Sequence, residues 1–71
     1  MKPLWKEAPV WAQWLAQDSH GAWGWYEHKP VIFPGECGVW DIEDVDHSWE
    51  RAGYDQKDNH EWHETLEMRE E

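Results

Sequence analysis

Eight tryptophans supply most of the bulky apolar surface of this chain, which has only ten Leu, Ile, Val and Phe residues among 71. So few aliphatic residues, together with a net charge of −10, would ordinarily indicate a disordered chain. A buried tryptophan, however, removes about 150–250 Å² from water, so a tryptophan core can replace an aliphatic one. We therefore expect one folded domain, residues 1–71, whose last few residues fray. A partly disordered chain that orders on its partner is the alternative.

The negative charge is concentrated in the second half of the chain. Residues 1–35 contain three acidic and three basic residues, whereas residues 36–71 contain 13 acidic and three basic residues. Nucleic acids and anionic membranes attract basic surfaces. The charge therefore argues against direct binding to nucleic acid or to a membrane, and it favours a partner protein with a basic surface.

Cysteine content and hydropathy indicate the compartment. Cys37 is the only cysteine of the sequence, so no disulfide can form within the chain, whereas small secreted domains usually depend on such bridges. No stretch has the length and apolar character of a signal peptide or a membrane span. These features predict a cytoplasmic protein.

The spacing of apolar residues predicts an α+β fold with a helix near each end. A short N-terminal helix over residues 8–18 ends before Gly21, which suits a left-handed cap. Its apolar stripe consists of Val10, Trp11, Trp14 and Leu15. A C-terminal helix over residues 59–70 follows Asp58, which matches the capping-box pattern with Glu61. The exposed face of this helix would carry Glu61, Glu64, Glu67 and Glu71.

An antiparallel hairpin is expected between the two helices. Residues 22–33 and residues 39–45 are rich in aromatic and β-branched side chains, which favour strands. Pro30 cannot donate to a ladder, so the first strand lies at an edge or breaks there. Residues 46–57 show no clear period and are expected to form a loop, marked by Gly53 and the polar run from Asp55 to Asn59. The expected fold allows a third short strand, to which the sequence assigns no position.

Two stretches together resemble a class of small acidic, tryptophan-rich proteins encoded by bacteriophages and prophages. The first is residues 8–30, with the pattern P-x-W-A-x-W-x-A-x-D-x-x-G-x-W-x-W-Y-E-x-x-P, and the second is residues 61–69, with the pattern W-x-x-T-L-x-x-R. Together they cover 32 of the 71 residues. The resemblance implies a phage origin and a host bacterial cytoplasm, but it implies no function and no catalytic residue.

Two groups of residues are candidate binding sites. Trp23 and Trp25 share a strand face and would form an aromatic platform for sugars or for side chains of a partner, or else belong to the core. Acidic residues in the second half would form a charged surface that imitates the phosphates of DNA, or else a solvated face that keeps the protein in solution. These acidic candidates are Asp41, Glu43, Asp44, Asp46, Glu61, Glu64 and Glu67.

Catalytic, metal and cofactor motifs are not found in the sequence. His60 and His63 lie three residues apart, so they do not form the HExxH pattern of zinc enzymes. Cys37 has no basic neighbour that would activate it, and no glycine-rich phosphate loop occurs. We therefore expect a non-enzymatic protein without cofactor or metal that binds a basic host protein. If that partner is a nucleic-acid-binding protein, the chain would inhibit it by charge mimicry. A carbohydrate-binding module and a structural or homodimeric phage protein are the alternatives.

Overall fold

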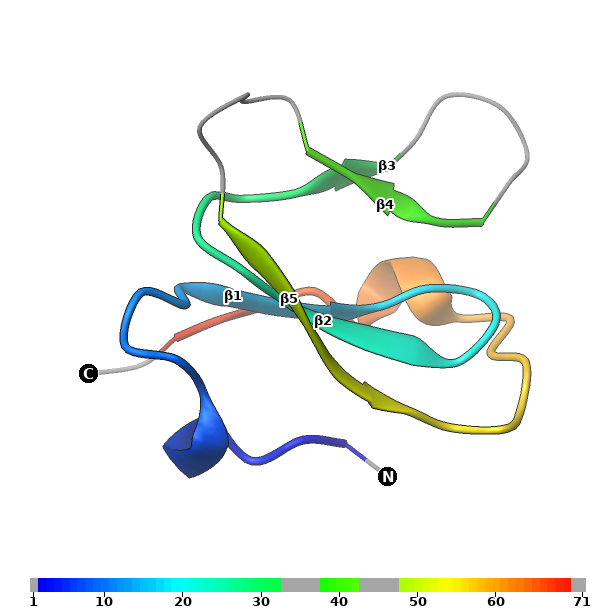
Figure 1. Ribbon diagram of the computed structural model, residues 1–71. Coiled ribbons are helices and arrows are strands. Elements are labelled where there is room, and N and C mark those ends of the chain that lie inside the picture. Colours follow the sequence, from blue (N-terminus) through cyan, green and yellow to red (C-terminus); the bar gives the residue numbers. More distant parts are fainter. Residues whose placement is uncertain (1, 33–37, 43–47, 70–71) are drawn as a thin grey trace.

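The computed structural model describes residues 2–32, 38–42 and 48–69. Its centre is a four-stranded antiparallel sheet with the strand order β5-β2-β1-β6, and a second, two-stranded sheet pairs β3 with β4 (Figure 1). The strands are β1 (Trp14–Gln17), β2 (Ala22–Tyr26), β3 (Val31–Ile32), β4 (Trp40–Asp41), β5 (Trp49–Tyr54) and β6 (Glu67–Met68). The helical elements are two single 3-10 turns, η1 (Trp5–Glu7) and η2 (Trp62–Glu64).

The register of β1 and β2 defines the two faces of the four-stranded sheet. Leu15 lies opposite Trp25 and Gln17 lies opposite Trp23, so these four side chains share one face, the N-terminal face. The other face, the hairpin face, carries Trp14, Ala16, Gly24 and Tyr26. The N-terminal segment with η1 lies on the side of the N-terminal face, and the β3–β4 hairpin lies on the opposite side of the sheet (Figure 1).

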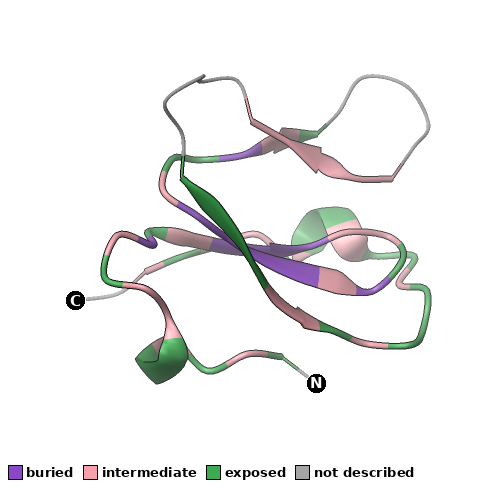
Figure 2. Ribbon diagram, in the orientation of Figure 1, coloured by how far each residue is buried: buried purple, intermediate pink, exposed green. Residues whose placement is uncertain are grey.

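The core lies on the N-terminal face and is built largely from tryptophan. Ala12, Leu15, Trp23 and Trp25 form a buried cluster. The half-buried residues that pack against it are Trp5, Ala8, Trp11 and Ala52. The rings of Trp5 and Trp25 are 4.9 Å apart, so the N-terminal segment closes the core. Burial is concentrated on the two central strands, β1 and β2, whereas much of β5 is exposed (Figure 2).

The predicted α+β fold is wrong, because residues 8–18 do not form a helix. The chain makes one turn, in which Ala12 N donates to Pro9 O (3.0 Å), and Gln13 N then donates to Tyr26 O across the sheet (2.9 Å). β1 follows and pairs with strands on both sides. Long-range strand pairing therefore overrides the helix propensity of its Leu, Ala and Gln residues.

Burial on both faces of β1 explains why the apolar spacing misled the prediction. Leu15 and Ala16 point to opposite faces of the sheet and both are buried, so the strand shows no apolar–polar alternation. Val10, which the predicted helix placed in the core, is 91% exposed. Trp11 and Trp14 are half-buried, and only Trp11 packs against the core cluster on the N-terminal face.

The predicted C-terminal helix over residues 59–70 is also wrong. Its helical part is the single turn η2, which ends where Thr65 N donates to Trp62 O (3.1 Å). The chain then extends, and β6 pairs with β1. A continuous helix would align carboxylates three residues apart, which repel each other. The extended path instead brings Glu67 to Lys2.

The strand predictions are confirmed in part. Residues 22–33 contain two strands, because β2 ends at Tyr26 and the chain resumes as β3 after the buried Pro30. The expected antiparallel pairing with the second strand holds for β3 and β4. The expected loop over residues 46–57 instead contains β5, which pairs with β2. Gly21, expected to cap a helix, has φ of 100° in the turn that joins β1 and β2.

Candidate functional site

One end of the four-stranded sheet is formed by two loops held side by side. Asp55 N donates to Gly21 O (2.8 Å), and Asn59 N donates to Ser19 O (2.9 Å). The buried Gln17 side chain joins the same loops, because its amide nitrogen donates to Gly21 O and its amide oxygen accepts from Asn59 Nδ2. These bonds fix the segment between β5 and η2 against the turn between β1 and β2.

Five carboxylates lie on the β1–β2 turn and on the segment 55–64, which is bonded to that turn and to the end of β1. We call this region the acidic end, and its carboxylates are Asp18, Asp55, Asp58, Glu61 and Glu64. Two of them turn inward. Asp18 Oδ1 accepts from the backbone N–H groups of His20 and Ala22, and Asp55 Oδ2 accepts from Trp23 Nε1. The other three carboxylates are exposed, and Lys57 is the one Lys or Arg residue in the two loops.

A shallow hollow lies beside the exposed carboxylates of the acidic end. Its volume is about 260 Å³. The lining residues are Ser19, His20, Asp58, Asn59, His60 and Trp62. The Trp62 ring packs edge-on against Trp40 of β4, with the ring centroids 5.5 Å apart. The acidic end therefore presents histidines and one indole next to its carboxylates.

Most of the basic side chains do not neutralise carboxylates. Lys29 lies over the Trp14 ring at 5.8 Å, and Arg51 lies over the Trp49 ring at 5.9 Å. The Arg69 guanidinium donates to the carbonyls of the turn at residues 9–12. Between described residues, the ion pairs formed by Lys or Arg with a carboxylate are limited to Lys2–Glu67. The negative charge of the acidic end is therefore largely uncompensated within the described part of the chain.

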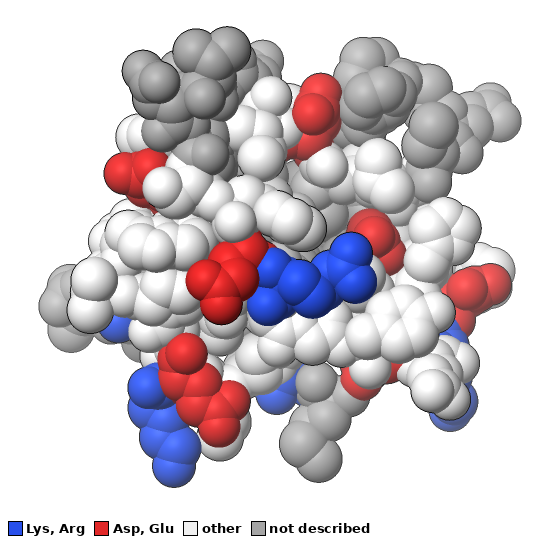
Figure 3. All heavy atoms as spheres, in the orientation of Figure 1, with Lys and Arg blue, Asp and Glu red and all other residues white. Residues whose placement is uncertain are grey.

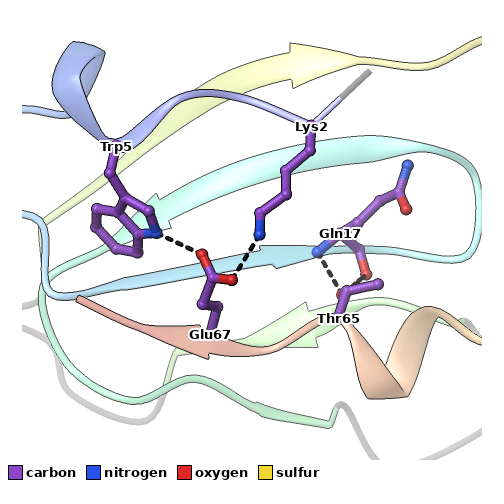
Figure 4. A network of polar contacts seen from close by, with 5 residues as sticks. All are labelled: Lys2, Trp5, Gln17, Thr65 and Glu67. Atoms are coloured by element: carbon purple, nitrogen blue, oxygen red, sulfur yellow. Dashed lines mark hydrogen bonds and ion pairs between the residues drawn. The ribbon is translucent and has the colours of Figure 1, made fainter. Parts of the chain in front are cut away.

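Glu67 was predicted to belong to the acidic binding surface, but it instead ties the N-terminus to β6. Its two carboxylate oxygens accept from Lys2 Nζ (2.5 Å) and from Trp5 Nε1 (Figure 4). The hydrogen bond from Lys2 is the main reason that the pKa of Glu67 lies below its usual range, although desolvation opposes it. Both partners lie on the N-terminal segment, so Glu67 fastens that segment over the sheet.

The remaining acidic candidates come from the middle of the sequence. Asp41 lies in β4, is half-buried, and accepts through Oδ1 from Ile42 N (2.8 Å). Glu43, Asp44 and Asp46 lie outside the described residues. Of the predicted surface residues, the structure therefore brings Glu61 and Glu64 together at η2, and it places Asp41 and Glu67 elsewhere in the fold.

Trp23 and Trp25 lie in the core. They are 7% and 4% exposed, and they pack with Leu15. The sequence left two interpretations of this pair open, and the burial agrees with the core interpretation.

Exposed aromatic residues occur instead on β5, which the sequence analysis assigned to a loop. Trp49 is 45% exposed and Tyr54 is 59% exposed. Trp49 leans over Gly24, where an added Cβ would come within 2.8 Å of its Nε1 atom, and it hydrogen-bonds the buried Tyr26 side chain. Desolvation by burial raises the pKa of Tyr26 despite this bond. The signal available in the sequence was the spacing of the large side chains Trp49, Arg51 and Tyr54, which alternates from 49 to 51 and then skips one extra residue.

The described residues hold no group of three His, Cys, Asp or Glu side chains arranged to bind a metal ion. In the same part of the chain, no helix has the length and apolar character needed to cross a membrane. Comparisons with models of protein families, with curated proteins and with solved structures gave no match to this chain.

Proposed function

We propose that this protein is a non-catalytic binding protein that recognises a partner protein with a basic surface in the cytoplasm. The observation that carries the proposal is the acidic end, where Asp58, Glu61 and Glu64 are exposed on a framework held by the buried Gln17. Lys57 is the one Lys or Arg residue in the two loops, and the side chains of Lys29, Arg51 and Arg69 lie over indole rings or against backbone carbonyls.

This arrangement suits recognition by charge complementarity. A fixed group of like charges raises the rate of encounter with an oppositely charged partner and disfavours partners of the same charge. Nucleic-acid-binding proteins have basic surfaces of this kind. The chain would inhibit such a protein by occupying the surface that otherwise contacts phosphates. If the resemblance to phage proteins reflects its origin, the partner belongs to the bacterial host.

Capture from a bacterial lysate with a matched pair of variants tests the proposal. Glu61→Gln combined with Glu64→Gln raises the net charge from −10 to −8, and Glu7→Lys on η1 raises it by the same amount away from the acidic end. We expect the wild type and Glu7→Lys to capture the same basic protein, and the double variant to retain less than one tenth of it. Equal capture by all three proteins would refute the role of the acidic end.

A further inference from the structure

The outer edge of β5 pairs with no strand among the described residues. β5 is the last strand on one side of the sheet and pairs only with β2 among the described strands. Ser48 O accepts from Glu27 N, and Asp55 N donates to Gly21 O, so both ends of this stretch direct their backbone groups toward β2. Because direction alternates along an antiparallel strand, the backbone groups of Trp49, Arg51 and Tyr54 point away from the sheet.

The outward backbone groups of β5 have no partner within the described part of the chain, where no hydrogen bond joins Trp49, Arg51 or Tyr54 to any segment other than β2. Such an edge is a template for another strand. On the face of the molecule drawn in Figure 3, uncharged atoms predominate, and acidic side chains lie next to the basic ones.

The side chains of β5 specify what such a strand would carry. Register with β2 places Trp49, Arg51 and Tyr54 on the hairpin face, and it places Glu50 on the N-terminal face. An added strand would therefore set alternate side chains beside the exposed rings of Trp49 and Tyr54, and the intervening side chains beside Glu50. The arginine of this strand already lies over the Trp49 ring. Apolar residues fit the hairpin face, and basic residues fit the other.

We infer that an extended segment of the basic partner, with alternating apolar and basic residues, adds to β5 as a fifth, antiparallel strand. This inference rests on the proposed function, because the basic residues of the added segment, which would lie beside Glu50, are taken to be part of the basic surface of the partner. A second copy of this chain fits less well, since pairing two β5 strands would bring together two chains of net charge −10. The extra residue at Ala52 interrupts the register, so regular pairing is centred on Trp49–Arg51.

A hexapeptide of alternating valine and lysine, with blocked ends, is the probe. In an antiparallel pair, the residues directly opposite Trp49 and Arg51 exchange both backbone bonds with them and share their face. Valine would occupy those positions. We expect N-methylation of the valine amides to weaken binding at least tenfold, whereas N-methylation of the lysine amides leaves binding nearly unchanged, because those amides face water. Equal binding of the two methylated peptides would overturn strand addition.

A variant pair tests the same contact from the protein side. Arg51→Pro removes an outward N–H that has no partner in the described chain, and Arg51→Thr removes the same side chain but keeps that N–H. We expect the proline variant to bind the probe at least tenfold more weakly than the threonine variant. We also expect the amides of Trp49 and Arg51 to exchange with solvent more slowly in the wild-type complex. Unchanged exchange at both amides would overturn the inference.

The two proposals fail in different ways. If the two N-methylated peptides bind equally and the double variant Glu61→Gln, Glu64→Gln captures less partner than the wild type, strand addition fails while the acidic end keeps its role. If binding discriminates between the methylated peptides and the double variant captures as much partner as the wild type, β5 is the site and the acidic end fails. If the amides of Trp49 and Arg51 become protected as the protein alone is concentrated, β5 pairs with a second copy, and the inference is overturned.

Discussion

Gly21→Ala should destabilise the protein far more than Gly53→Ala, although both glycines lie in or beside the same sheet. Gly21 has φ of 100°, and a Cβ there would lie 1.9 Å from Asp55 O and 2.8 Å from Lys57 O. Both atoms belong to the backbone, so the segment that carries them must move. At Gly53 the nearest atom to an added Cβ is Pro3 Cγ, at 3.9 Å, which is an ordinary contact.

The magnitude follows from two costs at Gly21. The left-handed backbone costs an alanine about 1–2 kcal/mol, and displacement of the neighbouring loop removes the bond from Asp55 N to Gly21 O, for about another 1 kcal/mol. We therefore expect a loss of about 2–3 kcal/mol in the free energy of unfolding at Gly21, measured by urea denaturation followed by tryptophan fluorescence. At Gly53 we expect a change of less than about 1 kcal/mol. Losses that agree within about 0.5 kcal/mol would refute the packing of the two loops.

Three further predictions concern the core, the N-terminal segment and the charge. Trp25→Ala should lower the free energy of unfolding by about 3–5 kcal/mol because the Trp25 ring is buried. Trp14→Ala should lower it by only about 2 kcal/mol because the Trp14 ring is partly in water. Equal losses of the two variants in urea denaturation would contradict this difference in burial. The pKa of Glu67 is lowered in the folded state, so its contribution to stability should be present above its unfolded pKa and disappear as the pH falls through its folded pKa. The free energies of unfolding of the wild type and Glu67→Gln should therefore converge in acid. A constant difference between them down to about pH 2 would contradict the ion pair. Raising NaCl from about 10 to about 100 mM shortens the Debye length from about 30 to about 10 Å, so Tm should rise by several degrees; a falling Tm in calorimetry would contradict self-repulsion.

The sequence predicted a core rich in tryptophan and part of the strand content, because these depend on local composition, but it left open whether Trp23 and Trp25 belong to that core. Trp23 and Trp25 alternate with Ala22, Gly24 and Tyr26 along β2. This alternation predicts that the two tryptophans share one face of the strand, as the structure shows. Of the two alternatives that Pro30 left open, an edge strand or a break, the structure shows a break, because β2 ends at Tyr26 and β3 begins at Val31. These residues act locally, so the sequence around them was sufficient.

The two helix predictions were wrong because the secondary structure of these segments depends on residues far away in the sequence. β1 pairs with β6 from the other end of the chain, and Glu67 meets Lys2 across 65 positions. No local pattern contains these pairings, and the glutamates near the C-terminus match a helical face by spacing alone. β5 was missed because the bulge at Ala52 breaks its alternation.

The sequence identified the acidic composition of the second half of the chain, but not how its carboxylates are arranged in space. Charge segregation identified the second half of the chain as acidic, and Glu61 and Glu64 do lie together on the surface. Asp18 comes from the neutral first half and reaches the acidic end only because the β1–β2 turn meets the loop after β5. The sequence could not show that contact, or the placement of Lys29 and Arg51 over indole rings.

The salt dependence of the dissociation constant tests the central claim most directly. The purified basic partner obtained by capture would be titrated, at NaCl concentrations from about 50 to about 200 mM, with three proteins: the wild type, the double variant Glu61→Gln, Glu64→Gln, and Glu7→Lys. We predict that Kd rises steeply with salt for the wild type and for Glu7→Lys, and clearly less steeply for the double variant, because it lacks two of the charges that face the partner. Identical slopes for the double variant and Glu7→Lys would show that only net charge matters, and would contradict a binding site at the acidic end.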